Sequence, residues 1–500
     1  MTNFIDRVVG YFDPAAGLKR MQIRNAIDVA RGYNAATSGR RVGNLRNSNT
    51  NASSEAGRFA KKLSGVSQDL VRNNPLAQRV KMIYASNIVG AGINLDISSN
   101  NKKVSKDFSE FYEEWAKSTG CDFDGHNSFS GLMWLLSATI VESGGCFIRF
   151  HINHAMIVPL QLQLIEQTYL DPTKDRNNAD EGLIINGVQY HKNGQIDGYW
   201  IDIDPTGTAQ SGLTNSKFYK KDEEMIHVFR RERPGQHLGI SWLAQIATHL
   251  ERYETLQDAK VMQQQIAACL AVLIEEAPSQ MNADNKSTPL ADKLEPGMME
   301  YVPAGSKVTT ITPPRTDDSQ HFITELKNDM AVGSGLNYQQ LTGDYSKFNF
   351  ASGRMGNIEF NRYLDSIQQF MLVPSLDKVL TKLFGLYQIK KGGNTVIKTE
   401  WVFPPRAAVN PKEEVETIVM KARSALITPQ VACKSFGTKL ETVVDGWTEA
   451  YKMMGDLPFD IRPDKFSAAG NQLDDNDAAS SNNEGSGEPE DESNGEPKEE

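Results

Sequence analysis

The sequence predicts an α+β protein in which helical segments flank a β-rich middle. Apolar residues recur at the spacing of amphipathic helices through 57–89, 105–118 and 128–142. Between 146 and 229 they alternate with polar residues at strand spacing, and two Asn-Gly pairs mark hairpin turns. Helical spacing returns after 242. A chain of 500 residues with 39% hydrophobic content is long enough for several domains and has an ordinary soluble composition.

Charge is concentrated at the two ends of the chain, whose net charge is −10. Residues 471–500 hold eleven acidic residues and one lysine, which equals the net charge of the whole chain. Residues 1–62 hold eleven basic and four acidic residues, a net charge of +7. A basic arm is compatible with a nucleic-acid or acidic protein partner, and equally with a solvated end.

Neither a signal peptide nor a membrane span is predicted. Asp6 and Arg7 interrupt the apolar residues of the N-terminus. The apolar run that starts at Gly131 ends at Glu142, short of the roughly 18 residues that cross a bilayer. We therefore expect a protein that starts in the cytoplasm and has no membrane partner. The cysteines at 121, 146, 269 and 433 are widely spaced, which predicts free thiols rather than a zinc site or a disulfide framework.

The first elements follow a polar arm. Residues 35–56 are rich in Asn, Ser, Thr and Gly, which predicts a loop or flexible arm. The helical pattern of 57–89 contains Pro75, which breaks or starts a helix. Asn73 and Asn74 precede it and are candidate N-caps.

Strands are predicted at 146–152, 160–164 and 225–229, and a three-strand meander at 181–203. The first strand is expected to place four side chains on one face, those of Cys146, Ile148, Phe150 and Ile152. The residues expected to pack the meander include Val188, Tyr190 and Trp200.

A long helix is predicted at 242–273, about 48 Å long if unbroken. Its apolar stripe ends at Leu273 and its other face is polar, so we expect it to pack against neighbouring helices or against copies of itself. Residues 274–317 interrupt the helical pattern with Pro-Gly turns and two expected strands, at 299–302 and 307–312. A helix at 317–333 is expected to follow.

The polar stretch LTGDYSKFNFASGRM (341–355) then separates two helices, with Gly343 and Gly353 as expected hinges. The next helix, at about 354–386, must kink at Pro374. A strand and three helices are expected after it, at 396–403, 411–424, 429–436 and 438–454. From 466 the chain loses all apolar periodicity, which predicts disorder.

Motifs for catalysis are absent from the sequence. It has no Walker nucleotide loop, no G-x-S-x-G and no H-E-x-x-H. His151 and His154 lack a third metal ligand nearby in sequence. Glu275 and Glu276 have no partner carboxylate that can be placed across a cleft. We therefore expect no cofactor, no metal and no enzymatic activity, which favours a structural or binding protein.

Three segments, taken together with their order and spacing, are informative: DLVRNNPLAQRVKMIYASNIVGAGI (69–93), VFRRERPGQHLGISWLAQIATHLERYETLQDAKV (228–261) and LTGDYSKFNFASGRM (341–355). Together they resemble the lambda-like family of portal proteins of tailed bacteriophages. That family has an R-N-N-P helix, an R-P-G-Q segment leading into a long helix, a module ending near a Pro-Pro pair (here Pro313–Pro314), and an L-T-G-D-Y-S loop. This sequence departs at Leu238, where Arg is usual, and at Phe350–Ala351, which replace Tyr-Ser. The resemblance covers about residues 55–460.

The resemblance implies a portal fold that forms a ring, usually of twelve subunits, around a central channel. The ring would sit at the unique capsid vertex of the virion after assembly in the host cytoplasm. Double-stranded DNA would pass through it non-specifically, first in packaging by the large terminase subunit and later in ejection. Head-completion or adaptor proteins, the major capsid protein and the scaffolding protein are the other implied partners. Motor chemistry would belong to terminase, which agrees with the missing nucleotide loop.

The resemblance also implies a division of the chain. The implied parts are a basic flexible arm (1–54), an α/β wing (55–241), a stem helix (242–273), a clip (274–316), a second stem helix (317–335), a tunnel loop (336–353), a wing helix and strand (354–408), a helical crown (409–465) and an acidic disordered tail (466–500).

Two groups of residues receive roles from the resemblance. The tunnel loop would line the narrowest part of the channel with Tyr345, Ser346, Lys347, Phe348, Asn349 and Phe350. Lys347 and its polar neighbours would touch phosphates weakly, whereas the aromatic rings would pack against neighbouring subunits because duplex DNA hides its bases. The clip would dock terminase through Glu275, Glu276 and Lys286. The alternative for the loop is a plain connector between helices without DNA contact.

Two other classes of protein are weighed against a portal. One is another head–tail connector ring protein, against which the module inserted between two helices argues. The other is an enzyme of head assembly, such as a nuclease or protease. A nuclease needs carboxylates that converge on a metal, and Asp202 and Asp204 stand on one predicted strand with nothing visibly converging on them.

Overall fold

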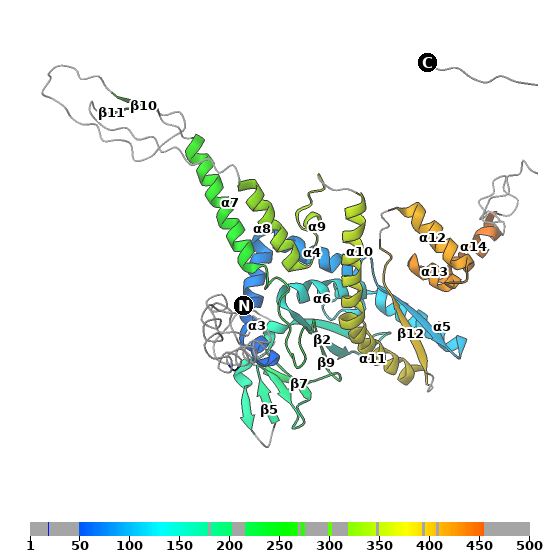
Figure 1. The fold of residues 1–500 in the computed structure, drawn as a ribbon. Coiled ribbons are helices and arrows are strands. Elements are labelled where there is room, and N and C mark those ends of the chain that lie inside the picture. The colour runs from blue at the N-terminus through cyan, green and yellow to red at the C-terminus, as the bar shows by residue number, and fades with distance from the viewer. Residues whose placement is uncertain are drawn as a thin grey trace, which may run out of the picture. The chain divides into compact units, whose positions relative to one another are not determined.

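The computed structural model describes Lys19 and residues 50–178, 182–202, 216–268, 272–275, 299–302, 319–346, 350–392, 396–406 and 410–454. They belong to two compact units, one ending at Val415 and the other beginning at Glu416. The mixture of helices and strands in the first unit confirms the α+β prediction (Figure 1). The predicted N-terminal arm up to residue 49, Lys19 apart, and the acidic tail lie outside the described residues. No described helix is long and apolar enough to cross a membrane.

Two helices joined at Asn74 open the first unit. Helix α3 spans Ala52–Asn73 and α4 spans Pro75–Val89. The Asn74 side chain caps α4 by accepting from the amides of Leu76 and Ala77, as predicted. Helix α3 begins inside the predicted loop 35–56, so that boundary was wrong. Its N-cap is Asn51, and burial of Ala52 and Ala56 holds the first turn in place.

A three-stranded antiparallel sheet forms the centre of the first unit. Its order is β3 (Leu160–Glu166), β2 (Gly145–Ile152) and β9 (Met225–Phe229). Strand β2 separates two apolar cores. Cys146, Ile148 and Phe150 face the larger one, whereas Phe147 faces the smaller. Ile152, expected on the first face, is half-exposed because the strand ends there.

Helices α5 (Lys102–Lys117) and α6 (Phe129–Ser143) follow the prediction in position. Helix α6 is not amphipathic, because nine of its 15 residues are buried. It contacts α4 and α5 as well as β2, so apolar residues are needed on several of its faces.

The predicted meander is part of a five-stranded antiparallel sheet. Its strands, in order, are β4 (Arg176–Asn178), β5 (Gly182–Ile185), β6 (Val188–Tyr190), β7 (Ile196–Asp202) and β8 (Ser216–Lys220). Asn186 and Gly187 adopt positive φ in the first turn, as its Asn-Gly pair predicts. Trp200, expected among the packing residues of the meander, packs within this sheet but outside the apolar core. Tyr199 is buried in that core, and the alternation of β7 turns Trp200 to the other face, against Phe218.

The long helix is shorter than predicted. Helix α7 spans Ala247–Ala268, about 33 Å rather than 48 Å. The residues before it form tight turns, in which the Trp242 amide bonds to the Val141 carbonyl instead of starting a helix. Leu273 belongs to strand β10 (Val272–Glu275), which pairs in parallel with the predicted strand β11 (Met299–Val302). The strand expected at 307–312 lies outside the described residues.

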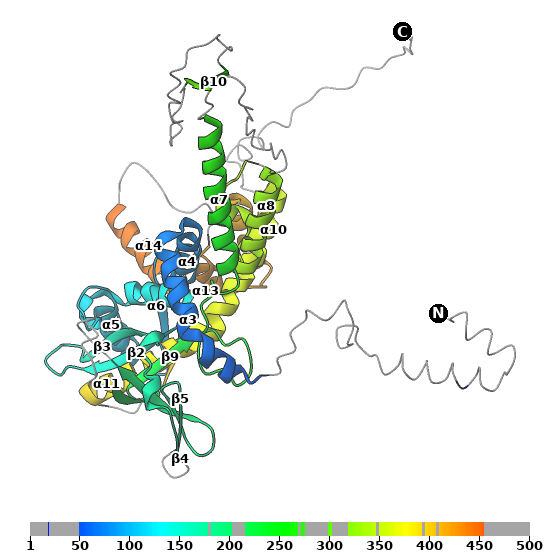
Figure 2. The same cartoon turned by 90° about the vertical axis from the view of Figure 1, so that its left-hand side faces the viewer.

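Helix α8 (Ser319–Ser334) returns beside α7 (Figures 1 and 2). A short helix α9 (Tyr338–Thr342) and helix α10 (Phe350–Ile367) follow. The interruption between them is therefore shorter than the predicted loop, and Gly353 is a helical residue rather than a hinge. A π-helical turn at Gln368–Leu372 then precedes α11 (Val373–Lys391). Pro374 explains this break, because it has no amide hydrogen and its ring crowds the preceding turn.

Distant parts of the chain close the first unit. Strand β12 (Ile397–Val402) pairs antiparallel with β1 (Asn94–Ser99). The remaining helices are α12 (Pro411–Arg423), α13 (Pro429–Ser435) and α14 (Leu440–Met454), all close to their predicted positions. Helix α12 crosses the boundary between the units, and α13 and α14 belong to the second.

Candidate functional site

The segment between α8 and α10 holds the residues predicted to line a DNA channel. Tyr345 and Ser346 lie in the described part, and 55% of the Tyr345 surface is exposed. Lys347, Phe348 and Asn349 lie outside it, as does the side chain of Phe350, the first residue of α10. Gly343 ends α9 with φ near 74°, and Asp344 accepts a hydrogen bond from the Ser346 amide at 3.0 Å.

Helix α4 holds the start of this segment. The Tyr84 hydroxyl donates to the Ser334 carbonyl at 2.7 Å, at the end of α8. Arg79 Nε donates to the Gln340 carbonyl at 2.6 Å, within α9. Leu341 is fully buried in the larger core. The segment therefore leaves a fixed base at Gly343 and returns to a helix at Phe350.

Tyr84 is also the centre of an aromatic cluster beneath that base. Its ring meets Trp242 edge-on at 4.9 Å and lies 6.0 Å and 6.3 Å from Phe360 and Tyr363. The Arg230 guanidinium lies over the Trp242 ring at 4.5 Å and donates to the Tyr363 hydroxyl at 2.6 Å. Burial raises the pKa of Tyr84, so its hydroxyl keeps the proton that it donates to Ser334.

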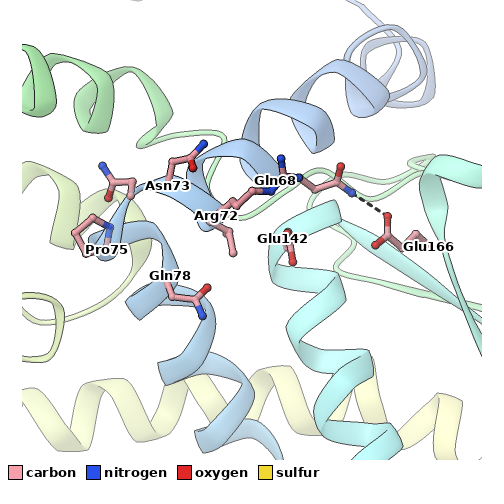
Figure 3. A pocket seen from close by; sticks show the side chains of 9 residues that line it. Gln68, Arg72, Asn73, Pro75, Gln78, Glu142 and Glu166 are labelled. Atoms are coloured by element: carbon pink, nitrogen blue, oxygen red, sulfur yellow. Dashed lines mark hydrogen bonds between the residues drawn. The ribbon is translucent and has the colours of Figure 1, made fainter. Parts of the chain in front are cut away.

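A polar groove of about 800 Å³ surrounds the junction of α3 and α4 (Figure 3). Nine residues line it: Gln68, Val71, Arg72, Asn73, Asn74, Pro75, Gln78, Glu142 and Glu166. The R-N-N-P motif, residues 72–75, thus forms one wall. Asn74 is 2% exposed and, besides capping α4, donates to the Glu254 carboxylate of α7 at 2.7 Å.

Pairs of side chains fix the other walls of the groove. Gln68 of α3 donates to Glu166 Oε2 at 2.8 Å, across to the end of β3 (Figure 3). Glu142 at the end of α6 pairs with Lys81 at 2.5 Å, and both side chains are about four-fifths buried. The groove joins elements by polar contacts and brings together no nucleophile and general base. It is a structural junction rather than a catalytic site.

The R-P-G-Q motif forms a tight turn before the aromatic cluster. Pro234 and Gly235 are its central residues, and Gly235 has φ near 77°, as a type II turn requires. The Gln236 side chain accepts from the amides of Glu232 and Arg233 and donates to the Leu238 carbonyl. Leu238, where the family resemblance expects Arg, is buried in the smaller core, so an apolar residue suits this chain.

Gln167 ties this turn to the central sheet. Its amide donates to the Gly239 carbonyl at 3.0 Å, and its Oε1 accepts from the Gly239 amide at 2.8 Å. The same oxygen lies 3.0 Å from His227 Nε2 on β9, so Nε2 carries the ring proton. His227 Nδ1 is buried without a partner, and burial lowers the pKa of this histidine to about 3.

The neutral His227 predicts that the protein loses stability in mild acid. Folding lowers the pKa of His227, so between pH 6.5 and 3 this histidine is protonated in the unfolded chain and neutral in the folded chain. Stability is therefore retained above pH 6.5 and lost as the pH falls, by about 2 kcal/mol at pH 5. Urea unfolding at pH 7 and 5 measures this, and His227→Gln should remove most of the difference. His321→Gln, on an exposed histidine, is the control, and an equal effect of both variants would contradict the assignment.

The other predicted sites do not form a reactive centre in the described part of the chain. His151 stacks on Phe123 at 4.1 Å and bonds to Gln163, and burial lowers its pKa. Among the described residues, no three His, Cys, Asp or Glu side chains are placed to hold a metal ion. Glu275 ends β10, and its side chain is not described, while Glu276 and Lys286 lie outside the described residues.

Three of the four cysteines are described, and all three are free, as predicted. Cys121 and Cys146 are buried, whereas Cys433 is half-buried. Burial raises the pKa of the Cys121 thiol to about 12, which makes it unreactive near neutral pH.

The residues that link the three motifs were not identified from the sequence. Arg79, Tyr84 and Glu254 each bond to a residue at least 180 positions away, so no local pattern indicates their partners. The sequence indicates only that Arg79 and Tyr84 stand on the helix predicted after R-N-N-P. The structure therefore brings the three motifs together on α4.

Comparison with known proteins gives a family match. The model of the family described as phage portal protein, lambda family, matches residues 38–368, more than half of the chain.

Three curated relatives are phage proteins. The probable portal protein of Halomonas phage phiHAP-1 is 22% identical over 421 residues, which cover 78% of this chain and 76% of the relative. The portal protein of Escherichia phage N15 is 21% identical, and the match covers 75% of this chain and 81% of the relative. Portal protein B of Escherichia phage lambda is 19% identical, and the match covers 75% of this chain and 80% of the relative.

Two solved structures similar to this chain come from gene transfer agent (GTA) particles. A chain in the neck of a native GTA particle computed with C12 symmetry has a TM-score of 0.42 and 14% identity, covering 77% of this chain and 99% of its own. A chain in the virion of a native GTA particle has a TM-score of 0.40 and 13% identity, covering 76% and 94%.

Proposed function

Because this chain belongs to the lambda family of phage portal proteins, we propose that its copies form the ring at the unique capsid vertex through which double-stranded DNA is packaged and later ejected. The match of the family model to residues 38–368 is the observation that carries this function. As a portal protein the chain is a structural protein of the phage and not an enzyme. The ring is proposed to contain twelve copies around a central channel.

The pair α7 and α8 supports assembly with further copies. The first half of α7 is anchored, with Leu250 and Tyr253 buried. Its second half exposes Val261 (54%) and Met262 (62%), and α8 exposes Phe322 (55%). Apolar side chains on a projecting pair of helices are stabilised when neighbouring copies cover them. These helices are therefore proposed to pack around the channel as the stem.

The ring is tested most directly by negative-stain microscopy of the purified protein. Rings with a central hole are expected, and a compact monomer under all conditions would contradict the proposal. Met262→Asp is expected to convert most rings to smaller species, because a charge cannot be buried at an apolar contact without a partner. Gln264→Asp, at an exposed polar position two residues further along α7, is the control and should leave the rings intact. Intact rings from Met262→Asp would show that this face of α7 is not part of the interface between copies.

The remaining portal parts are proposed with boundaries adjusted to the structure. The wing comprises 55–241 together with α10, α11 and β12, and the stem comprises α7 and α8. The clip lies at 274–316, and the crown comprises α12, α13 and α14 within 409–465. Pairing of β1 with β12 supports placing the two stretches of the wing, one before α7 and one after α8, in one body.

Partners are proposed for each end of the ring. The clip would dock the large terminase subunit and later the head-completion proteins, through Glu275, Glu276 and Lys286. The outer surface would meet the major capsid and scaffolding proteins during assembly in the host cytoplasm. DNA would pass the loop after Gly343 without sequence reading, because contacts to phosphates carry no base information.

The acidic tail is expected to be dispensable for ring formation. Residues 471–500 carry a net charge of −10 and little apolar surface, so they bury almost nothing at an interface. A chain truncated at 466 should sediment as the same ring as the full chain. Only monomers after truncation would show that the tail belongs to the interface. The charge repeated around a ring would repel DNA from the crown.

A further inference from the structure

The second unit is built from helices that bury nothing completely. Helices α13 and α14, with the part of α12 after Val415, form its described part, and Figure 1 shows the three helices gathered together. Among the described residues from 411 to 454, none is buried. The described part of this unit has about 40 residues. A set of helices of that size needs a covered apolar core or another staple to be stable by itself.

An apolar groove of about 520 Å³ runs between these helices. It is lined mainly by Ile418 and Val419 of α12, Ala432 of α13, and Phe436 and Val443. Cys433 lies in the same wall and is half-buried. The groove is therefore a surface of the kind that another apolar segment covers. The Cys433 thiol can be labelled chemically, so its reactivity reports whether the groove is covered.

The sequence directly after α14 has the composition of such a segment. The helix ends at Met454, and Gly455 follows at the position where glycine commonly reverses a chain after a helix. The next residues are DLPFDI, in which Leu457, Phe459 and Ile461 stand at alternate positions, separated by Pro458 and Asp460. Pro458 disfavours continuation of the helix through Leu457, so the pattern predicts an extended segment with one apolar face.

The length of this segment matches its distance from the groove. Val443 lies eleven residues before Met454, which is about 16 Å along α14. An extended chain that turns back at Gly455 covers about 3.3 Å per residue, so Phe459 reaches about 13 Å and Ile461 about 20 Å. The two positions lie on either side of the level of Val443, which lines the groove together with Cys433.

We propose that residues 457–461 fold back along α14 and fill the groove with Phe459 and Ile461. The segment is favoured over a second copy of the chain because its tether to α14 keeps it at a high effective concentration beside the groove. The acidic residues that follow would then start from a fixed point on the surface of the second unit. This inference does not depend on ring formation.

Thiol labelling of Cys433 in the full chain tests the proposal. A docked segment shields Cys433, whereas Cys121 and Cys146 are buried in either case. The double variant Phe459→Asp, Ile461→Asp should label at Cys433 at least tenfold faster than the wild type. Labelling of the Cys433→Ser chain is subtracted as background, which also accounts for Cys269.

The controls separate the segment from the tail and from neighbouring copies. Leu473→Asp, on an apolar residue of the acidic tail, and truncation at 466 should both leave the Cys433 rate unchanged. An unchanged rate in the double variant would overturn the proposal. A wild-type rate that rises on dilution would overturn it in favour of a second copy.

A disulfide provides a measurement that does not depend on a disruptive variant. Phe459→Cys should form a disulfide with Cys433 within one chain under mild oxidation, detected on a non-reducing gel. Cross-linked dimers without the internal disulfide would overturn the proposal, as would the absence of any disulfide. Leu473→Cys is the matched control and should form the internal disulfide at least tenfold more slowly.

Discussion

Replacing Asn74 by alanine is expected to lower the free energy of unfolding by about 3 kcal/mol. Asn74 is 2% exposed and its side chain makes three hydrogen bonds, two as the cap of α4 and one to Glu254. Loss of an N-cap costs about 1 kcal/mol. Loss of a hydrogen bond to a charged group costs about 2 kcal/mol, because the Glu254 carboxylate is left without that donor.

The neighbouring asparagine of the same motif provides the control. Asn73 is exposed and donates to Asp69 four residues earlier in α3, so Asn73→Ala should cost less than about 0.5 kcal/mol. Asn74→Asp keeps the cap but places a second carboxylate within hydrogen-bond distance of Glu254. It should be destabilising at pH 7 and less so as the pH falls and one carboxylate is protonated. Urea unfolding at fixed protein concentration measures all three variants, and equal losses for Asn73→Ala and Asn74→Ala would contradict the role of Asn74.

Local signals in the sequence were sufficient for most elements of the fold. Asn74 before Pro75 predicts the start of α4, because the amides of the first turn need a side-chain acceptor. Asn186–Gly187 predicts a hairpin, because both residues tolerate positive φ. Such features depend on a few neighbouring residues, so sequence position and structural position agree.

Features that depend on distant residues were not predicted. The start of α7 was misplaced because the Trp242 amide pairs with Val141, a hundred residues earlier. The pairing of β10 with β11 has no local pattern, since parallel strands require a long connection between them. The same limit applies to the candidate site, because Arg79 and Gln340 are 261 positions apart. The sequence predicts the loop as an interruption between helices, whereas its attachment to α4 is visible only in three dimensions.

Alanine at Lys347, Phe348 and Phe350 together is expected to lower DNA packaging on the order of tenfold without preventing assembly. The hydrogen bond from Arg79 and the burial of Leu341 hold the base of the loop, at Gln340 and Leu341. The three substituted residues lie beyond Gly343, whose φ near 74° marks the point where the chain leaves that base. Ring formation depends in this proposal on α7 and α8, so rings and proheads should form normally.

The two kinds of side chain are expected to contribute unequally. In this proposal Lys347→Ala removes one salt-screened phosphate contact per subunit, so each copy contributes little and the loss adds up only where several loops touch DNA at once. Phe348→Ala with Phe350→Ala should reduce packaging more, because these two rings are proposed to pack each loop against its neighbours. Raising the salt concentration should mimic the first variant and not the second.

An in vitro packaging assay on proheads carrying each variant measures these effects directly. Lys103→Ala, on an exposed lysine at the start of α5, controls for the loss of one positive charge per subunit. Electron microscopy of the same proheads separates a failure of packaging from a failure of assembly. Because the base of the loop is fixed by Arg79 and Tyr84, the variants should alter only what the loop touches. Wild-type packaging from the triple variant would therefore reduce this segment to a plain connector between α9 and α10.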